Sequence, residues 1–316
     1  MKPEREAILT ILLIFCLTQL IGVYAGVQIF NVTQTNPELE KTFNVSPAPK
    51  SDISNTFFYL GAVLLGAVVM VLTIKFYKGK FMFKFLELII VGNGAAVVGF
   101  AVLLFFFSLE FAIGGGILIG IVAALIRFSR EEKIVRNTAA ILASAGIGAM
   151  FGYSLGFVPA VLFAVALSFY DFFAVFIAKH MITFAQHFSA KNLSFSVVAA
   201  SGKDKKIEIP VEKAKSMGMQ VTDDEMKSGK KKIETKQVHL ELGTGDLVIP
   251  LVLAVSALPV YGLLGSYMII MSSLVGLLFV LSEVMKKKRF LPALPYLIIP
   301  CLIMIFILHL LQNKGF

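Results

Sequence analysis

Long apolar runs recur along almost the whole chain, and they constrain its fold more than any other feature. A helix needs roughly 20 apolar residues to cross the ~30 Å of hydrocarbon in a bilayer. Charged, proline or glycine clusters end six such runs before residue 180: 7–30, 57–74, 85–108, 111–125, 139–155 and 159–178. Only 16% of the residues are charged, and the mean hydropathy of +0.84 excludes a water-soluble protein of this length. Each run therefore predicts a membrane-spanning helix.

Three more spans follow a polar segment. Residues 246–284 contain no basic residue and are too long for one crossing. The natural break is their proline and glycine cluster: Pro259, Gly262 and Gly265. A last run covers 292–311. The sequence predicts an all-α integral membrane protein with nine transmembrane helices, arranged as a six-helix bundle (1–188), a polar cytoplasmic loop (189–241) and a three-helix part (242–316).

The positions of the 29 Lys and Arg residues predict the orientation. If the N-terminus is cytoplasmic, 26 of them fall in inner segments, and the outer side keeps three: Lys41, Lys50 and Lys314. Basic residues concentrate in cytoplasmic loops of membrane proteins. The pattern predicts a multi-pass protein of the cell membrane with its C-terminus outside. It also accounts for the net charge of +9 without nucleic-acid binding.

The first run could instead be a cleaved signal peptide, since Lys2 and Arg5 precede it. Its 24 residues exceed a typical hydrophobic region of such a peptide. We therefore expect it to be retained as a span.

Ionisable residues inside the runs are functional candidates, because a charge in hydrocarbon costs roughly 2.5 to 3.5 kcal/mol. Pairing near the membrane surface explains most of them, such as Glu87 beside Lys84. Asp171 and Asp246 remain. No run contains an interior Lys or Arg, so we expect the two acids to be each other's partners. Two such carboxyl groups share one proton, and a water between them meets an acid and a base, as amide hydrolysis requires.

Each acid also has a simpler explanation. Asp246 follows Gly243, Thr244 and Gly245 and could be the N-cap of the seventh span. Asp171 could hydrogen-bond a neighbour such as Asn93.

The surroundings of Asp246 favour a functional role. Pro250 has no N–H, so the carbonyl of Asp246 loses its usual helical partner. Gly243 and Gly245 permit positive φ angles and the close approach of another backbone. At the cytoplasmic start of the ninth span, proline is suited to the first helical position, and if Pro292 occupies that position the helix starts at little cost.

Three motifs occur in order: Tyr170-Asp171, Gly243-Thr244-Gly245-Asp246 and Pro292-Ala293-Leu294. With nine spans and a large loop between the two aspartates, this order resembles the presenilin and signal peptide peptidase family of intramembrane aspartyl proteases. The closest fit is a microbial, archaeal member, nearer to the peptidase branch than to presenilin. The resemblance covers essentially the whole chain in topology, although the motifs cover only about ten residues.

The resemblance implies proteolysis within transmembrane segments of membrane proteins or signal peptides. It implies that Asp171 and Asp246 are the catalytic pair and that Tyr170 lines the site. It also implies that the other motif residues support the active site: Gly243, Thr244, Gly245, Pro292, Ala293 and Leu294. It implies transmembrane helices as substrates, the bilayer as solvent, no cofactor and activity without accessory subunits.

A transmembrane substrate must unwind before its peptide bond can be reached. Val238, Leu240 and Leu242 alternate with polar residues just before Gly243. Their spacing predicts a short strand with these side chains on one face, and we hypothesise that it pairs with the unwound substrate.

The alternative from another class is a proton- or cation-coupled transporter or channel, because membrane aspartates also build ion pathways. The sequence shows neither the inverted repeats nor the paired broken helices common in transporters. It also lacks the HExxH motif of zinc proteases. The two cysteines, Cys16 and Cys301, have no metal-ligand spacing, so no metal is expected.

Overall fold

The computed structural model describes residues 3–44, 52–76, 81–174, 196–201, 206–210, 230–234, 238–287 and 291–313. Within these ranges the chain is mainly helical. Before the polar loop its elements are α1 (Pro3–Thr35), η1 (Pro37–Leu39), α2 (Glu40–Phe43), α3 (Ser54–Phe76), α4 (Phe81–Phe106), α5 (Leu109–Ser129), α6 (Lys133–Leu155) and α7 (Phe157–Phe173). After it come α11 (Thr244–Ser256), α12 (Leu258–Lys287) and α13 (Ala293–Asn313). Every predicted apolar run overlaps at least one of these helices.

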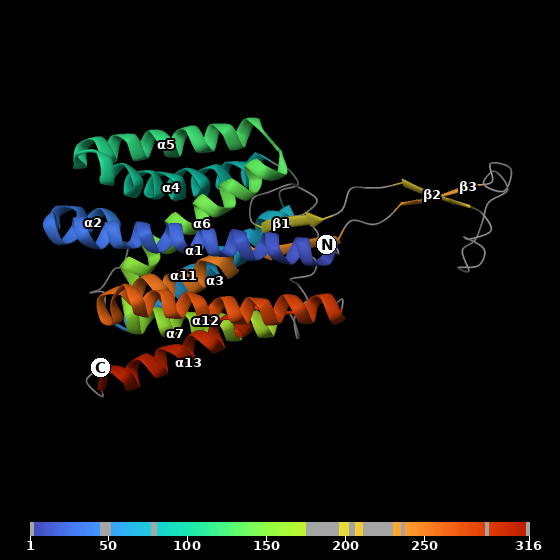
Figure 1. Ribbon diagram of the computed structural model, residues 1–316. Coiled ribbons are helices and arrows are strands. Elements are labelled where there is room, and N and C mark those ends of the chain that lie inside the picture. The colour runs from blue at the N-terminus through green and yellow to red at the C-terminus, as the bar shows by residue number, and fades with distance from the viewer. Residues whose placement is uncertain are drawn as a thin grey trace. The chain divides into compact units, whose positions relative to one another are not determined.

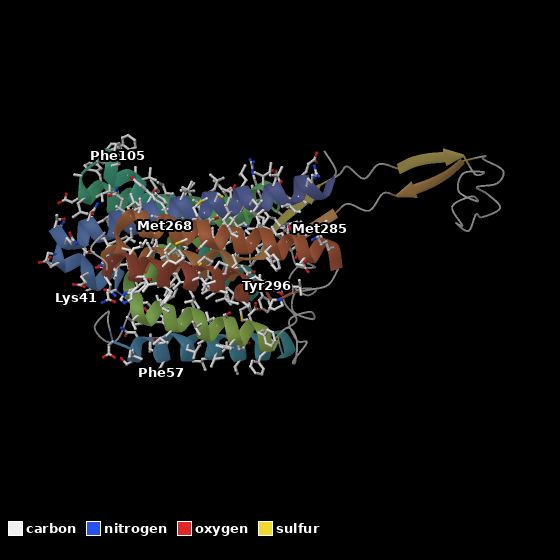
Figure 2. The ribbon with its side chains drawn as sticks, turned by 60° about the horizontal axis from the view of Figure 1, so that its bottom comes forward. Lys41, Phe57, Phe105, Met268, Met285 and Tyr296 are labelled. Atoms are coloured by element: carbon white, nitrogen blue, oxygen red, sulfur yellow. The ribbon has the colours of Figure 1, made fainter. Side chains whose placement is uncertain are left out.

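The lengths of the helices fit a membrane protein. In the described ranges, six helices are long and apolar enough to cross a bilayer: α1, α4, α5, α6, α12 and α13. Three shorter apolar segments accompany them: Ser54–Gly66, Phe157–Phe173 and Thr244–Ser256. The outer surface is apolar as well, and Phe57 and Phe105 are each 70% exposed (Figure 2). The prediction of an all-α integral membrane protein is confirmed.

The long apolar run 246–284 is divided, as predicted, and one of its two interruptions lies at Gly262 of the predicted cluster. α11 ends at Ser256, Ala257 forms the turn, and Pro259 then lies in the first turn of α12, where its missing N–H costs nothing. Gly262 adds a second interruption, with φ at 65° and ψ at −170°. The hydroxyl of Ser266 donates a 2.7 Å bond to the carbonyl of Ala254 and so ties the two helices together.

Glycines set the closest helix contacts. On α5, a Cβ at Gly116 or Gly120 would strike the backbone of α4, which lies beside it (Figure 1). On α6, a Cβ at Gly148 or Gly152 would clash with side chains of α11. Small residues permit such approach between helices in lipid. On α3, Ala62 and Gly66 are four residues apart, as are the two glycines on α5 and on α6. Nothing lies within 4 Å of the Cβ position of Gly66, however.

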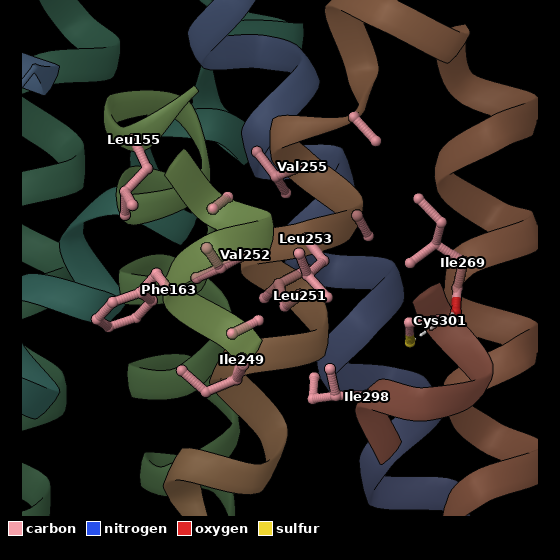
Figure 3. Close-up of a cluster of buried hydrophobic side chains, with 14 of the residues drawn as sticks. Leu155, Phe163, Ile249, Leu251, Val252, Leu253, Val255, Ile269, Ile298 and Cys301 are labelled. Atoms are coloured by element: carbon pink, nitrogen blue, oxygen red, sulfur yellow. Dashed lines mark hydrogen bonds between the residues drawn. The ribbon is translucent and has the colours of Figure 1, made fainter. Parts of the chain in front are cut away.

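The main apolar core surrounds α11. Its buried side chains include Leu251, Leu253 and Val255, which pack with Phe163 of α7 and Ile298 of α13 (Figure 3). Every residue of α11 from Ile249 to Ser256 is buried. The helix that carries Asp246 is therefore enclosed by its neighbours.

An ion pair that the sequence did not predict joins α4 to α5. The Nε of Arg127 donates a 2.7 Å hydrogen bond to Oε1 of Glu87, and the two side chains are 2% and 3% exposed. Lys84, expected beside Glu87, instead pairs with Glu131 at 2.9 Å. Arg127 lies in the last turn of α5. It is two residues beyond the predicted run 111–125, so the sequence pattern predicts a loop position for it.

Four short strands lie in the described part of the polar region. β1 (Ser196–Ser201) pairs with β4 (Val238–Gly243), and β2 (Lys206–Pro210) pairs antiparallel with β3 (Lys230–Glu234). The chain divides into two compact units, one formed by residues 1–11 and 198–241 and the other by 12–197 and 242–316. The residues of α6, α7, α12 and α13 that pack around α11 belong to the second unit.

Candidate active site

Asp171 lies near the end of α7, and its side chain is buried, with 7% exposed. Its Oδ2 accepts a 3.2 Å hydrogen bond from the backbone N–H of Leu294, 123 residues further along the chain. The same carboxyl group also accepts a backbone hydrogen bond from Ala293. The Asp171 side chain is thus held by the first turn of α13.

The sequence of α13 explains why these two N–H groups are available. The helix begins at Ala293, so Pro292 precedes it and is not its first residue. The first N–H groups of a helix lack partners within the helix, and Pro295 has none to offer. Ala293 and Leu294 therefore supply the donors of this turn, at a helix end that favours a negative charge.

Asp246 occupies the first turn of α11, three residues after the N-cap. The N-cap is Gly243, so the alternative in which Asp246 itself caps the helix is wrong. Its carboxyl group accepts a hydrogen bond from the backbone of Gly243. An acidic residue that reaches back to the N-cap in this way forms half of a capping box, which fixes the orientation of the side chain.

Gly243, the residue before this helix, leaves space beside Asp246, but its backbone angles are ordinary. Gly243 has φ at −64° and ψ at 144°, a conformation open to any residue, and the described glycines with positive φ are Gly156 and Gly262. A Cβ at Gly243 would lie 3.3 Å from Oδ2 of Asp246. Neither Gly243 nor Gly245 adopts the positive φ that glycine permits. Nothing lies within 4 Å of the Cβ position of Gly245, so the surface there is open.

The two aspartates face a common region. Their helices, α7 and α11, pack against each other and share the apolar core. Asp171 is close enough to act electrostatically on Asp246. In the described part of the chain, neither carboxyl group takes part in an ion pair. Asn93 is not the partner of Asp171, because its amide donates to the carbonyl of Ile89 in its own helix.

The remaining predicted residues lie on α7, on α11 or on the strand that precedes α11. Tyr170 precedes Asp171 and is 43% exposed. Thr244, the first residue of α11, lines a cavity of about 50 Å³ together with Glu87 and Ser144. The predicted strand is β4, where Leu240 and Leu242 are buried and Glu241 between them is exposed. This alternation is what the period-two pattern predicted.

The described residues offer no site for a metal, since no three His, Cys, Asp or Glu side chains cluster there. His309 bonds to Asn313 on the exposed side of α13. His180 and His187 lie outside the described residues.

Sequence reasoning identified the acids but not what holds them. A backbone donor has no signature of its own, yet the two prolines of the Pro292-Ala293-Leu294-Pro295 segment were a usable signal, because they leave two N–H groups in that turn. Gln19 of α1 was also missed; its side chain bonds to the backbone next to Asp246.

The chain resembles known proteins over nearly its whole length. Residues 15–313 match the model of a family described as signal-peptide peptidase, presenilin aspartyl protease. A solved structure of a presenilin family intramembrane aspartate protease in space group C222 has a TM-score of 0.62 and 20% identity, and the match covers 96% of this chain and 99% of that one. A structure in space group P2 with the same description has a TM-score of 0.57 and 19% identity, with 93% and 96% covered. No curated protein matches the sequence significantly.

Proposed function

Because the chain belongs to the signal-peptide peptidase and presenilin family of aspartyl proteases, we propose that Asp171 and Asp246 form its catalytic pair. The enzyme class is aspartic endopeptidase, acting within the membrane. The bond from the Leu294 N–H to Asp171 is the observation that carries this assignment, because it joins two of the three motifs at one place.

The two carboxyl groups are held differently, which suits two roles. Asp171 is held from another helix, by the backbone of Ala293 and Leu294. Asp246 is held from its own helix, by the backbone of Gly243. Neither arrangement brings a cation that would keep both groups ionised. We propose that they share one proton and bind the attacking water between them.

The proposed reaction needs no group beyond the pair and water. The ionised carboxylate removes a proton from the water, whose oxygen attacks the peptide carbon, while the protonated carboxyl group gives its proton to the carbonyl oxygen. The gem-diol then collapses. The carboxyl group that took the water proton gives it to the amide nitrogen, the other carboxylate takes a proton from one gem-diol hydroxyl, and the C–N bond breaks to leave an acid and an amine. General acid and base catalysis of this kind contributes about 10²- to 10⁴-fold to a rate.

The substrate would reach the pair in an extended form. Exposed backbone at the edge of a strand can pair with another extended segment, and β4 leads directly into the N-cap of α11. We propose that Val238, Leu240 and Leu242 belong to the strand that pairs with the unwound substrate. The open surface at Gly245 leaves room beside Asp246, and Tyr170 would line the same space.

We further propose nine spans with a cytoplasmic N-terminus and an outer C-terminus. Six long helices and three shorter apolar segments support this number, and the distribution of basic residues supports the direction. The polar loop 189–241 would then face the cytoplasm, between a six-helix part (1–188) and a three-helix part (242–316). Substrates would be transmembrane helices, cut without accessory subunits in the cell membrane.

Purified protein in detergent, incubated with a membrane-spanning peptide, tests the catalytic assignment. Asp171→Ala and Asp246→Ala should each abolish cleavage. Asp52→Ala is the matched control, because Asp52 lies before α3 and its carboxyl group bonds to the N–H of Ser54; it should cleave normally. Cleavage that survives either active-site substitution would refute the paired mechanism. Reconstituted protein that moves protons or cations through the same two aspartates and does not cut the peptide would support the transporter alternative, which the family match does not favour.

A further inference from the structure

A buried amide side chain connects α1 to the helix that carries Asp246. Gln19 lies near the middle of α1 and is 0% exposed. Its Nε2 donates a 2.8 Å hydrogen bond to the backbone carbonyl of Leu247, the residue that follows Asp246. A buried amide needs such a partner, because an unmade hydrogen bond in apolar surroundings is costly.

Stability alone is a poor explanation for this amide. Its Oε1 has no hydrogen-bond partner within the described part of the chain. An unsatisfied buried polar atom costs about as much free energy as the single hydrogen bond to Leu247 contributes. An apolar side chain of similar size would hold the two helices together at least as well. The contribution of Gln19 is therefore to the position of α11 and not to the stability of the fold.

Apolar packing fixes the sideways position of α11. Leu247, Leu251 and Val255 are spaced by four residues and so share one face of this helix. On α1, a Cβ at Gly22 would clash with Leu251 and one at Gly26 with Val255. From α6, Gly148 and Gly152 accommodate the same two side chains. Glycine surfaces on two helices thus enclose α11.

The hydrogen bond from Gln19 adds a directional constraint on the position of α11 along its axis. A hydrogen bond weakens steeply when its length or angle changes, so the bond from Gln19 defines a preferred axial position. The first turn of α11 has particular need of it, because Pro250 removes the N–H that would bond to the carbonyl of Asp246. Gln19 acts one residue away from that weakened point.

We propose that Gln19 is a positioning residue that sets the axial position of Asp246 relative to Asp171 by holding the carbonyl of Leu247. The proposal rests on the proposed catalytic role of Asp246. A displacement of about 1 Å can cost on the order of a hundredfold in rate, so loss of the Gln19 bond lowers kcat, whereas substrate binding at β4 is unaffected.

Gln19→Met tests the proposal, because methionine keeps the length of the side chain and removes the donor. Thr18→Val is the matched control: Thr18 is equally buried on the same helix, but its hydroxyl bonds to the carbonyl of Ile14 in α1 itself. With the full-length protein and a membrane-spanning peptide, kcat of Gln19→Met should fall about tenfold or more. KM should stay within about twofold, and the limbs of the pH–rate profile should shift, because the coupling between two acids depends on their separation. Thr18→Val should keep the wild-type kcat and profile.

Gln19→Glu provides a second variant of the same shape in case Gln19→Met does not fold. Protonated Glu can donate to the carbonyl of Leu247 and ionised Glu cannot, so its activity relative to wild type should rise as the pH is lowered. Wild-type kcat and an unshifted profile in Gln19→Met, or equal losses in Gln19→Met and Thr18→Val, would overturn the proposal. Failure of the catalytic assignment is separate, because it would show as cleavage by Asp246→Ala whatever Gln19→Met does.

Discussion

The backbone N–H of Leu294 donates a hydrogen bond of 3.2 Å to Oδ2 of Asp171. This bond joins α7 to the first turn of α13 and gives the Pro292-Ala293-Leu294 segment a physical role. The prolines on either side restrict the free donors of that turn to Ala293 and Leu294, and both bond to the same carboxyl group. The segment is therefore an anion site at a helix N-terminus, occupied by a side chain of the protein itself.

Leu294→Pro removes the donor while keeping a residue that the first turn of a helix accepts. A hydrogen bond to a charged group contributes about 1.5–3 kcal/mol, so we expect proteolysis to slow roughly tenfold to a hundredfold. Leu294→Ala keeps the N–H and should lose much less activity. Peptide cleavage rates and melting temperatures of both variants check this, and equal rates for the two would contradict the role of the N–H.

Gly243→Ala should place a methyl group 3.3 Å from Oδ2 of Asp246. The backbone angles at Gly243 suit alanine, so the effect comes from the methyl group alone. We expect a loss of about tenfold to a hundredfold in kcat from the displaced carboxylate, with little change in melting temperature. Gly114→Ala is the control, because nothing lies within 4 Å of its Cβ position, and it should cleave at the wild-type rate.

The buried pair of Glu87 and Arg127 should matter for stability. Breaking a buried ion pair leaves an uncompensated charge, so Glu87→Leu and Arg127→Leu should each lower the free energy of unfolding by about 3–5 kcal/mol. The double variant should lose less than either single one. In contrast, Lys84→Ala breaks a pair whose side chains are 31% and 59% exposed and should cost less than about 1 kcal/mol. Denaturant unfolding in detergent measures all four, and additive losses in the double variant would argue against the pair.

Proline in β4 should interfere with substrate pairing, because it lacks the N–H that a strand donates. His239→Pro and Glu241→Pro should therefore reduce cleavage by roughly tenfold while the helices remain folded. Lys232→Pro is the matched change in β3, which pairs with β2 and not with the proposed substrate strand. Undiminished cleavage by the β4 variants would reject the strand hypothesis.

The helices and the aspartates could be predicted from the sequence because both depend on local or compositional rules. An apolar run must be helical in lipid, since its backbone has no other partner, and acids without a cation stand out in such runs. The break near Pro259 was predicted within a few residues, because proline and glycine act locally.

Contacts between distant residues could not be predicted in the same way. The pair of Glu87 with Arg127 depends on how α4 and α5 face each other, and Lys84 was nearer in sequence. Asp246 resembled an N-cap because it follows two glycines, whereas helix α11 begins two residues earlier and uses Gly243 as its cap. The Gln19 bond spans 228 residues, and only the packing of α1 on α11 brings its ends together.

The central claim is that Asp171 and Asp246 act as one unit, and a double-mutant cycle on kcat tests it most directly. Asp171→Asn and Asp246→Asn keep the size of each side chain and remove its acid. Residues that act together show strongly non-additive losses, so each single variant should lose about a thousandfold or more, and the double variant should be no slower than the slower single one. Substantial cleavage by either single variant, or losses that multiply in the double variant, would contradict the paired mechanism.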